Sequence, residues 1–225
     1  MVWMDNIGKI AIIFSFIGIF TLYGILLLVD PPLVSLDDVA HHKGAEIRTT
    51  GFIREFRITE AGNVVMAITG GKARTELPLF VRTGSGPGPG LLNLSYGDKI
   101  EVEGRVGTFR GDIQLVVSED TIRRVSPKQE SNITFISQIA VDPGRYDGRK
   151  IRVVGYIDDR FTRSFFLRSS EIGGHRMRVV LRDKDMSIAI SELQEGARII
   201  VEGFFSYEPM NLRYELNLIS FEEAR

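Results

Sequence analysis

The octapeptide GDKIEVEG at residues 97–104 returns as GARIIVEG at residues 196–203. A second pair precedes it in each case: GAEIRTTGFI at 44–53 corresponds to GRKIRVVGYI at 148–157. Apolar and polar residues largely alternate in these segments, a pattern typical of half-buried β-strands. The chain beyond its first thirty residues therefore contains two copies of an internal repeat.

The alternating pattern of each copy predicts five strands, which are separated by turns containing Gly, Pro, Asn and Asp. The expected strands of the first copy are 46–58, 63–70, 73–83, 98–107 and 112–118, and those of the second are 149–160, 164–169, 175–182, 197–206 and 212–220. A helix is expected at 186–193, between the third and fourth strands of the second copy. The corresponding stretch of the first copy, 84–90, is rich in Gly and Pro, so we expect it not to be helical.

The repeated strands carry patterns that a known fold shares. The first strands read Ile47-x-x-x-Gly51-x-Ile53 and Ile151-x-Val153-x-Gly155-x-Ile157, and residues 97–106 and 113–117 add the fourth and fifth strands of the first copy. These patterns resemble OB-fold domains of the nucleic-acid-binding, tRNA-anticodon-binding type. The resemblance implies two tandem five-stranded Greek-key barrels, at 34–125 and 132–225, joined by a linker at 126–131. The glycines in these strands suit a barrel corner, where a bent strand has no room for a Cβ.

A different pattern occupies the N-terminus. After a flank at 1–9, residues 10–29 are uncharged for 20 positions, or about 30 Å of helix at 1.5 Å per residue. Asp30-Pro31-Pro32 follows without a small-x-small cleavage site, which favours an uncleaved transmembrane helix over a signal peptide. Lys9 and the α-amine place the N-terminus in the cytoplasm by the positive-inside rule. The expected fold class is therefore all-β, with two OB-like barrels behind a single N-terminal membrane helix and outside the cytoplasm.

Charge and composition narrow the functions. The chain has 28 Lys and Arg against 29 Asp and Glu, and no Cys, which excludes a disulfide scaffold and a thiolate metal site. Each copy is neutral by itself, with 12 residues of each sign in 31–125 and 15 of each sign in 126–225. This balance argues against strong, charge-driven binding of nucleic acid. It still permits a local surface of Arg and aromatic side chains.

Such a surface is the leading hypothesis, because single-strand binding combines aromatic stacking with cations along a groove. Period-two alternation from the inward Ile47, Gly51 and Ile53 predicts that the intervening side chains point outward. The candidate nucleic-acid-binding residues are Phe52, Arg54, Phe56, Arg57, Arg160, Phe161, Arg163, Arg176 and Arg178.

Other classes of function find less support in the sequence. No catalytic motif is present, and His41-His42 lacks a third clustered ligand, so we expect no enzyme, no metal and no cofactor. One alternative is a membrane-tethered assembly module that binds a protein partner, for example by β-augmentation. A membrane helix followed by an OB barrel also resembles the haem chaperone of cytochrome c maturation. That resemblance implies haem attachment through a His or Cys near the end of the barrel, and this chain has no His after His175 and no Cys.

Overall fold

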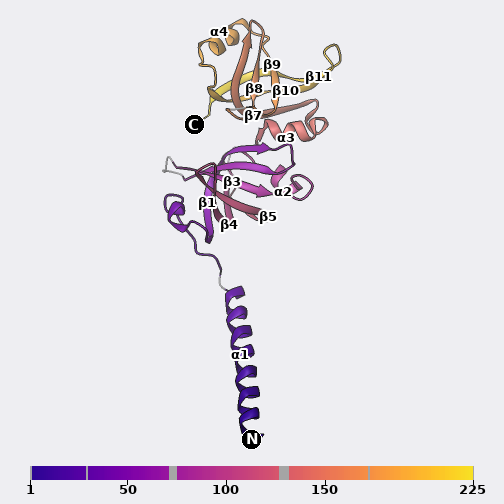
Figure 1. The fold of residues 1–225 in the computed structure, drawn as a ribbon. Helices are drawn as coiled ribbons and strands as arrows, with labels where there is room; N and C mark the ends of the chain where they lie inside the picture. Colours follow the sequence, from indigo (N-terminus) through magenta and orange to yellow (C-terminus); the bar gives the residue numbers. More distant parts are fainter. Residues whose placement is uncertain (1, 29, 71–74, 127–131, 172, 225) are drawn as a thin grey trace. The chain divides into compact units, whose positions relative to one another are not determined.

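The computed structural model describes residues 2–28, 30–70, 75–126, 132–171 and 173–224 (Figure 1). The chain divides into two compact units, Met1–Pro32 and Leu33–Arg225. Most of the expected linker, residues 127–131, lies outside the described residues.

The first unit contains the helix α1, Val2–Leu28. Ser15 and Thr21 donate hydrogen bonds to the carbonyls of Ala11 and Ile17, one turn earlier, as apolar helices allow. The membrane prediction, however, is wrong: within the described part of the chain, no helix combines the length and the apolar character that a bilayer crossing requires. The expected anchor at 10–29 and the single-pass location with extracytoplasmic barrels are corrected accordingly.

The second unit begins with a five-stranded closed barrel. Its strands are β1 (Glu46–Ile58), β2 (Val64–Thr69), β3 (Glu76–Arg82), β4 (Lys99–Phe109) and β5 (Asp112–Ser126). The order around the barrel is β1-β2-β3-β5-β4, with β3 and β5 parallel and β4 paired back to β1. This order and its parallel closure give an OB-like barrel, as the resemblance implies.

A second sheet repeats the arrangement. It contains β6 (Ile133–Phe135), β7 (Arg149–Phe161), β8 (Ser164–Arg168), β9 (Arg176–Val180), β10 (Arg198–Glu208) and β11 (Arg213–Glu223). Strand β10 pairs with β7, which closes the ring β7-β8-β9-β11-β10, and β9 and β11 are parallel. The extra strand β6 runs parallel to the start of β7. Both rings are thus closed along the described strands, and β6 lies outside the second ring, paired with β7.

The segments between the third and fourth strands differ between the copies. The second barrel has α4 (Lys184–Glu192), close to the expected helix. The first barrel has a single turn, α2 (Pro89–Leu92), so the prediction that 84–90 contains no helix is wrong at its last two positions. The reason is that proline fits the first turn of a helix, where its missing N–H has no intrahelical partner.

The bent strands need their glycines for close packing. A Cβ added at Gly104 would lie 2.4 Å from the carbonyl oxygen of Val116, and one at Gly203 would lie 2.3 Å from that of Asn217. The register of β4 with β5 shifts between Val102 and Gly104, and that of β10 with β11 shifts at Gly203. The repeated glycines therefore mark the places where neighbouring backbones approach too closely for any side chain.

The core of the first barrel extends into the second half of the chain. Its buried cluster includes Ile133, Phe135, Val154 and Ile200 together with the side chains of β1 to β5. The lead segment of the second barrel, β6 and α3 (Ile136–Val141), supplies the first two of these residues. Gln138 of α3 donates to the carbonyl of Leu94 at 2.8 Å, so the same segment also satisfies the backbone of the short α2 region. The one-turn helix leaves the end of the first barrel to be filled by the second.

Candidate nucleic-acid interface

The best-formed cluster of aromatic and cationic side chains lies on β8 and β9 of the second barrel. Phe166 points outward from β8, between the inward Phe165 and Leu167, which are fully buried. The guanidinium carbon of Arg176, on β9, lies 4.4 Å from the centroid of the Phe166 ring. Phe161, at the hairpin after β7, meets Phe166 edge to face with centroids 6.3 Å apart. OB barrels bind oligomeric ligands on the face of their second and third strands, the position of this cluster.

The cluster remains accessible to a ligand. Phe161 is 59% exposed, and Phe166 is half-buried. Arg163, at the turn between β7 and β8, is exposed, and its guanidinium has no hydrogen-bond or ion-pair partner within the described ranges. The hairpin between β10 and β11 adds Met210 and Leu212, which are 90% and 79% exposed. An aromatic face, an unpaired cation and an exposed hairpin therefore lie on the loops and strands where an OB barrel binds.

Acidic side chains neutralise part of this face. Arg176 pairs with Asp158 at 2.9 Å and with Asp159 at 2.5 Å. Arg178 pairs with Glu215 at 2.8 Å and donates to Ser164 Oγ at 3.2 Å. Both predicted cations of β9 are therefore held in place, and their charge is partly cancelled.

Glu215 is the buried member of these pairs. Burial by itself raises the pKa of Glu215, but hydrogen bonds from Arg213 and Arg178, together with their positive charges, lower it below its ordinary value. The carboxylate is consequently charged at neutral pH and holds two guanidiniums at once, each at 2.8 Å.

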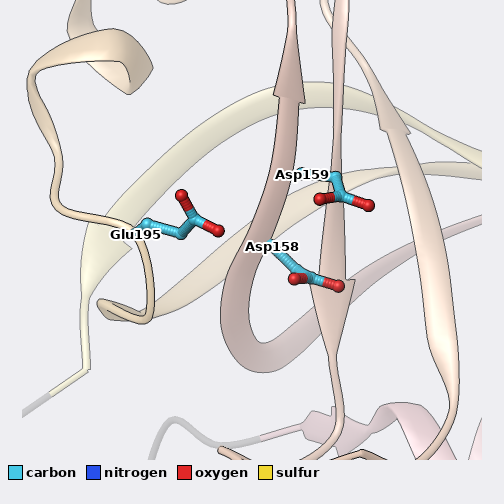
Figure 2. A group of neighbouring side chains, drawn as sticks. All are labelled: Asp158, Asp159 and Glu195. Atoms are coloured by element: carbon cyan, nitrogen blue, oxygen red, sulfur yellow. The ribbon is translucent and has the colours of Figure 1, made fainter.

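Figure 2 shows a second acidic group at the edge of this face. Asp158 and Asp159 come from β7, and Glu195 comes from the loop before β10; one oxygen of each lies within 4.8 Å of the others. Arg176 bridges both aspartates, and Arg168 lies 3.7 Å from Asp158. The two arginines thus hold both aspartates in an ion-pair network, and the carboxylate of Glu195 lies beside it.

Arg160, also predicted to bind nucleic acid, has a structural role instead. Its Nη1 donates to the carbonyls of Ser191 at 3.1 Å and Leu193 at 2.5 Å, at the end of α4. A cation at this position satisfies carbonyls that the helix leaves unpaired and complements its dipole. Arg160 thus fixes the C-terminal end of α4.

The predicted surface on the first barrel is interrupted by a β-bulge. The register of β1 with β2 shifts between Ile53 and Glu55, so inward positions change from odd to even numbers. Phe56 is therefore fully buried and stacks on Phe135, and the expectation that it points outward is wrong. A ring in the core is not available for stacking with a base.

The other three predicted residues of β1, Phe52, Arg54 and Arg57, have different surroundings and do not form one surface. Arg54 donates to the hydroxyl of Tyr96 at 2.6 Å, and its guanidinium lies over the Tyr96 ring. Phe52 and Arg57 are half-buried. Arg57 borders a pocket of about 660 Å³ whose other wall includes Tyr156 and Arg198 of the second barrel. The outer surface of the first barrel is therefore partly used for contact with the second.

That contact centres on Arg198. Its guanidinium lies between two rings, 5.0 Å from the centroid of Tyr96 and 5.3 Å from that of Tyr156. Arg198 also donates to the backbone carbonyl of Arg54, the residue at the β1 bulge, and the hydroxyl of Tyr156 donates to Glu55. Burial raises the pKa of Tyr156, and the hydrogen bond to Glu55 raises it further, whereas the charge of Arg198 opposes the shift. Tyr156, the counterpart of Phe52 in the repeat, is a residue of the junction.

Sequence reasoning missed Phe166. The signal was present, because alternation counted from the apolar Leu167 places Phe165 inward and Phe166 outward. The structure unites Phe161, Arg176 and Arg178 with Phe166 and leaves Arg163 beside them at the hairpin turn. It ties the guanidinium of Arg160 to the end of α4 and separates the residues of β1 from the cluster.

Comparisons with known proteins concern the fold. No family model matches the chain, and no curated protein matches it either. Among solved structures, a putative aspartyl-tRNA synthetase from Leishmania major Friedlin matches 44% of this chain at 11% identity and a TM-score of 0.36. Asparaginyl-tRNA synthetase from Pyrococcus horikoshii matches 51% at 16% identity and 0.37, and the S. pombe Stn1-ten1 complex matches 38% at 18% identity and 0.31. The matches cover 21% and 28% of the two synthetase chains and 67% of the third. With TM-scores below 0.5, these likenesses carry no further conclusion about this chain.

Proposed function

We propose that this chain is a non-enzymatic OB-fold binding protein whose second barrel holds single-stranded nucleic acid weakly and without strong sequence preference. The observation that carries the proposal is the packing of Arg176 on Phe166, with Phe161 against the same ring, on the β8–β9 face. Aromatic rings stack on any base, and guanidiniums contact phosphate or stack as well. Weak binding follows from the acidic partners of Arg176 and Arg178 and from the neutrality of the barrel.

The site divides into two roles. Phe161 and Phe166 would stack with successive bases, since both rings lie at the surface of one face. Arg163 would contact the phosphate backbone, because it is exposed and no described acidic side chain engages it. Arg176 supports the Phe166 ring and is held by Asp158 and Asp159, so it would orient the face more than neutralise phosphate.

Fluorescence anisotropy with a labelled oligothymidylate of about 16 nucleotides, the upper end of the footprint of one OB fold, tests the proposal on the full chain. Phe161→Ala should weaken binding about 5- to 150-fold, from the loss of about 1–3 kcal/mol of stacking per base. Phe204→Ala is the matched control, because Phe204 is similarly exposed, at 52%, on β10 away from this face. Equal affinity of the wild type and Phe161→Ala, or an equal loss in both variants, would overturn the assignment.

The charge contribution has its own test. Arg163→Gln should weaken binding and reduce the slope of log K against log salt by about 0.7, the contribution of one phosphate contact on a single strand. Arg123→Gln, which removes an exposed arginine from β5 of the first barrel, should change neither.

A protein partner is the second candidate, favoured by one observation. Met210 and Leu212 form an apolar tip on the β10–β11 hairpin, and residues this exposed and apolar mark interaction surfaces when they cluster. A photoreactive residue at position 210 should then crosslink one defined protein in nuclease-treated extract. The double variant Met210→Ser and Leu212→Ser should abolish capture by a second photoreactive residue placed at position 208.

A further inference from the structure

A separate pocket of about 560 Å³ lies away from the β8–β9 face, where the first barrel meets the start of β7. Residues 92–95 of the first barrel form one part of its wall. The lead segment of the second barrel, the short 3-10 helix η2 (Pro143–Tyr146) and residues 149–152 of β7 form most of the remainder. The volume is within the range of small-molecule sites, about 300–1,000 Å³.

Positive charge dominates this pocket. Four cationic side chains line it, Arg145, Arg149, Lys150 and Arg152, against one carboxylate, Glu202. Glu202 is already engaged, since it forms an ion pair with Lys150 and lies 4.0 Å from Arg152. Arg152 is further paired with Glu222.

Two guanidiniums of this pocket form no ion pair with the residues that the structure describes. Arg145 donates to Asn93 Oδ1 at 3.2 Å, a neutral partner that positions the guanidinium across the barrel junction. Arg149 is exposed, and its side chain has no hydrogen-bond or ion-pair partner in the part of the chain that the structure describes. The two arginines come from adjoining elements, η2 and β7, and line the same pocket.

Neutral donors complete the lining. Ser95, Asn132 and Thr134 place hydroxyl and amide groups around the same space. Guanidiniums match the oxygens of phosphate with two parallel hydrogen bonds, and a concave wall concentrates the field of several like charges. A ligand with several adjacent negative charges gains most from such a site, because each uncompensated cation adds to its binding.

We propose that this pocket binds a phosphate-type polyanion, either inorganic polyphosphate or the polyphosphate group of a nucleotide, with Arg145 and Arg149 as its principal ligands. The proposal is independent of nucleic-acid binding on the β8–β9 face. Because residues of both barrels form the wall, an occupied pocket also strengthens their contact and raises the melting temperature of the chain.

Isothermal titration calorimetry of the full chain with tripolyphosphate at low ionic strength tests the proposal. The wild type should bind, and the double variant Arg145→Gln and Arg149→Gln should bind at least tenfold more weakly. Arg123→Gln, on an exposed strand outside the pocket, should bind as the wild type does. A parallel titration with ATP without divalent cation separates the two sources: equal affinity indicates that the polyphosphate alone is recognised, and tighter binding of ATP indicates a nucleotide.

Three outcomes would overturn the proposal. One is the absence of tripolyphosphate and ATP binding to the wild type at low ionic strength. Another is an equal loss of affinity in the double variant and in Arg123→Gln, which would indicate general charge attraction without a site. Far-ultraviolet circular dichroism of each variant confirms folding; retention of wild-type affinity in a folded double variant counts against the proposal as well.

Discussion

The ring of Phe135, from the lead strand of the second barrel, stacks on the ring of Phe56 in the core of the first, with centroids 5.6 Å apart and an interplanar angle of 25°. Phe135 also meets Tyr96 edge to face at 6.3 Å. The one-turn α2 cannot cover this end of the first barrel, whereas α4 in the second barrel has nine residues. The two barrels are therefore joined through a shared core as well as through their surfaces.

Truncation of Phe135 should destabilise the first barrel. Phe135→Ala removes a ring that is 3% exposed and leaves a cavity against Phe56, with an expected loss of about 3–5 kcal/mol in the free energy of unfolding. Urea denaturation measures this change in the free energy of unfolding. Phe161→Ala, at a surface ring, should cost less than about 1 kcal/mol. Equal costs for the two variants would show that Phe135 is not part of the core.

Two glycines of β4 should respond differently to alanine. A Cβ at Gly104 would lie 2.4 Å from a backbone oxygen that cannot move without disturbing β5, whereas a Cβ at Gly107 would lie 3.7 Å from a methyl group of Val116. Gly104→Ala should therefore lower the melting temperature by about 6–12 °C or prevent folding, from an overpacking cost of roughly 3 kcal/mol. Gly107→Ala should stay within a few degrees of the wild type. Similar melting temperatures for the two variants would contradict the close packing of β4 on β5.

The stability of the junction should depend on pH in the alkaline range through Tyr156. Its pKa is raised above the ordinary value of 10.0, so the folded chain keeps the proton that the unfolded chain releases. This contribution is fully present below pH 10 and is lost as the pH rises above it, by about 1.4 kcal/mol per pH unit for one proton. Urea denaturation between pH 9 and about pH 11 should show a shallower decline for Tyr156→Phe than for the wild type. Parallel declines would mean that Tyr156 ionises equally in both states. The slopes are compared because the variant also loses the hydrogen bond to Glu55 at every pH.

Release of the arginines on the second barrel should strengthen nucleic-acid binding. Glu215 holds Arg178 and Arg213 at 2.8 Å each, so Glu215→Gln exposes two charges to the phosphate backbone. The affinity for oligothymidylate should rise several-fold, and the salt slope should steepen by about 0.7 for each phosphate that a released arginine binds. Glu223→Gln, which changes an exposed acid of β11 that forms no ion pair among the described residues, is the control and should leave affinity unchanged. The same increase in both variants, or none in either, would contradict the role of Glu215.

The sequence predicts the strands because their period-two pattern and glycines reflect local geometry. Strand β1 begins and ends where the alternation predicts, at Glu46 and Ile58, and most of the other predicted strands follow within three residues. Strand β5 continues to Ser126, eight residues beyond its predicted end, and β6 is not predicted. The prediction fails at Phe56 because a bulge adds one residue to β1, and alternation has no signal for such an insertion. It also fails to show that Arg176 and Arg178 are neutralised, because their acidic partners come from β7 and β11.

The N-terminal segment shows a different limit. The apolar run at 10–29 predicts a helix, and α1 is helical, but the step from an apolar helix to a membrane span is contradicted. The junction could not be predicted at all. Arg198, Tyr96 and Tyr156 lie far apart in the sequence, and their cation–π contacts depend on how one barrel docks on the other.

The position of Phe135 has a consequence for synthesis on the ribosome. All five strands of the first barrel leave the exit tunnel before Phe135 does. The core of the nascent first barrel is therefore incomplete until β6 has been synthesised. Domains of a growing chain usually fold one after another as each is completed. Here the first repeat depends on its neighbour for completion, and the pair should melt in one cooperative transition.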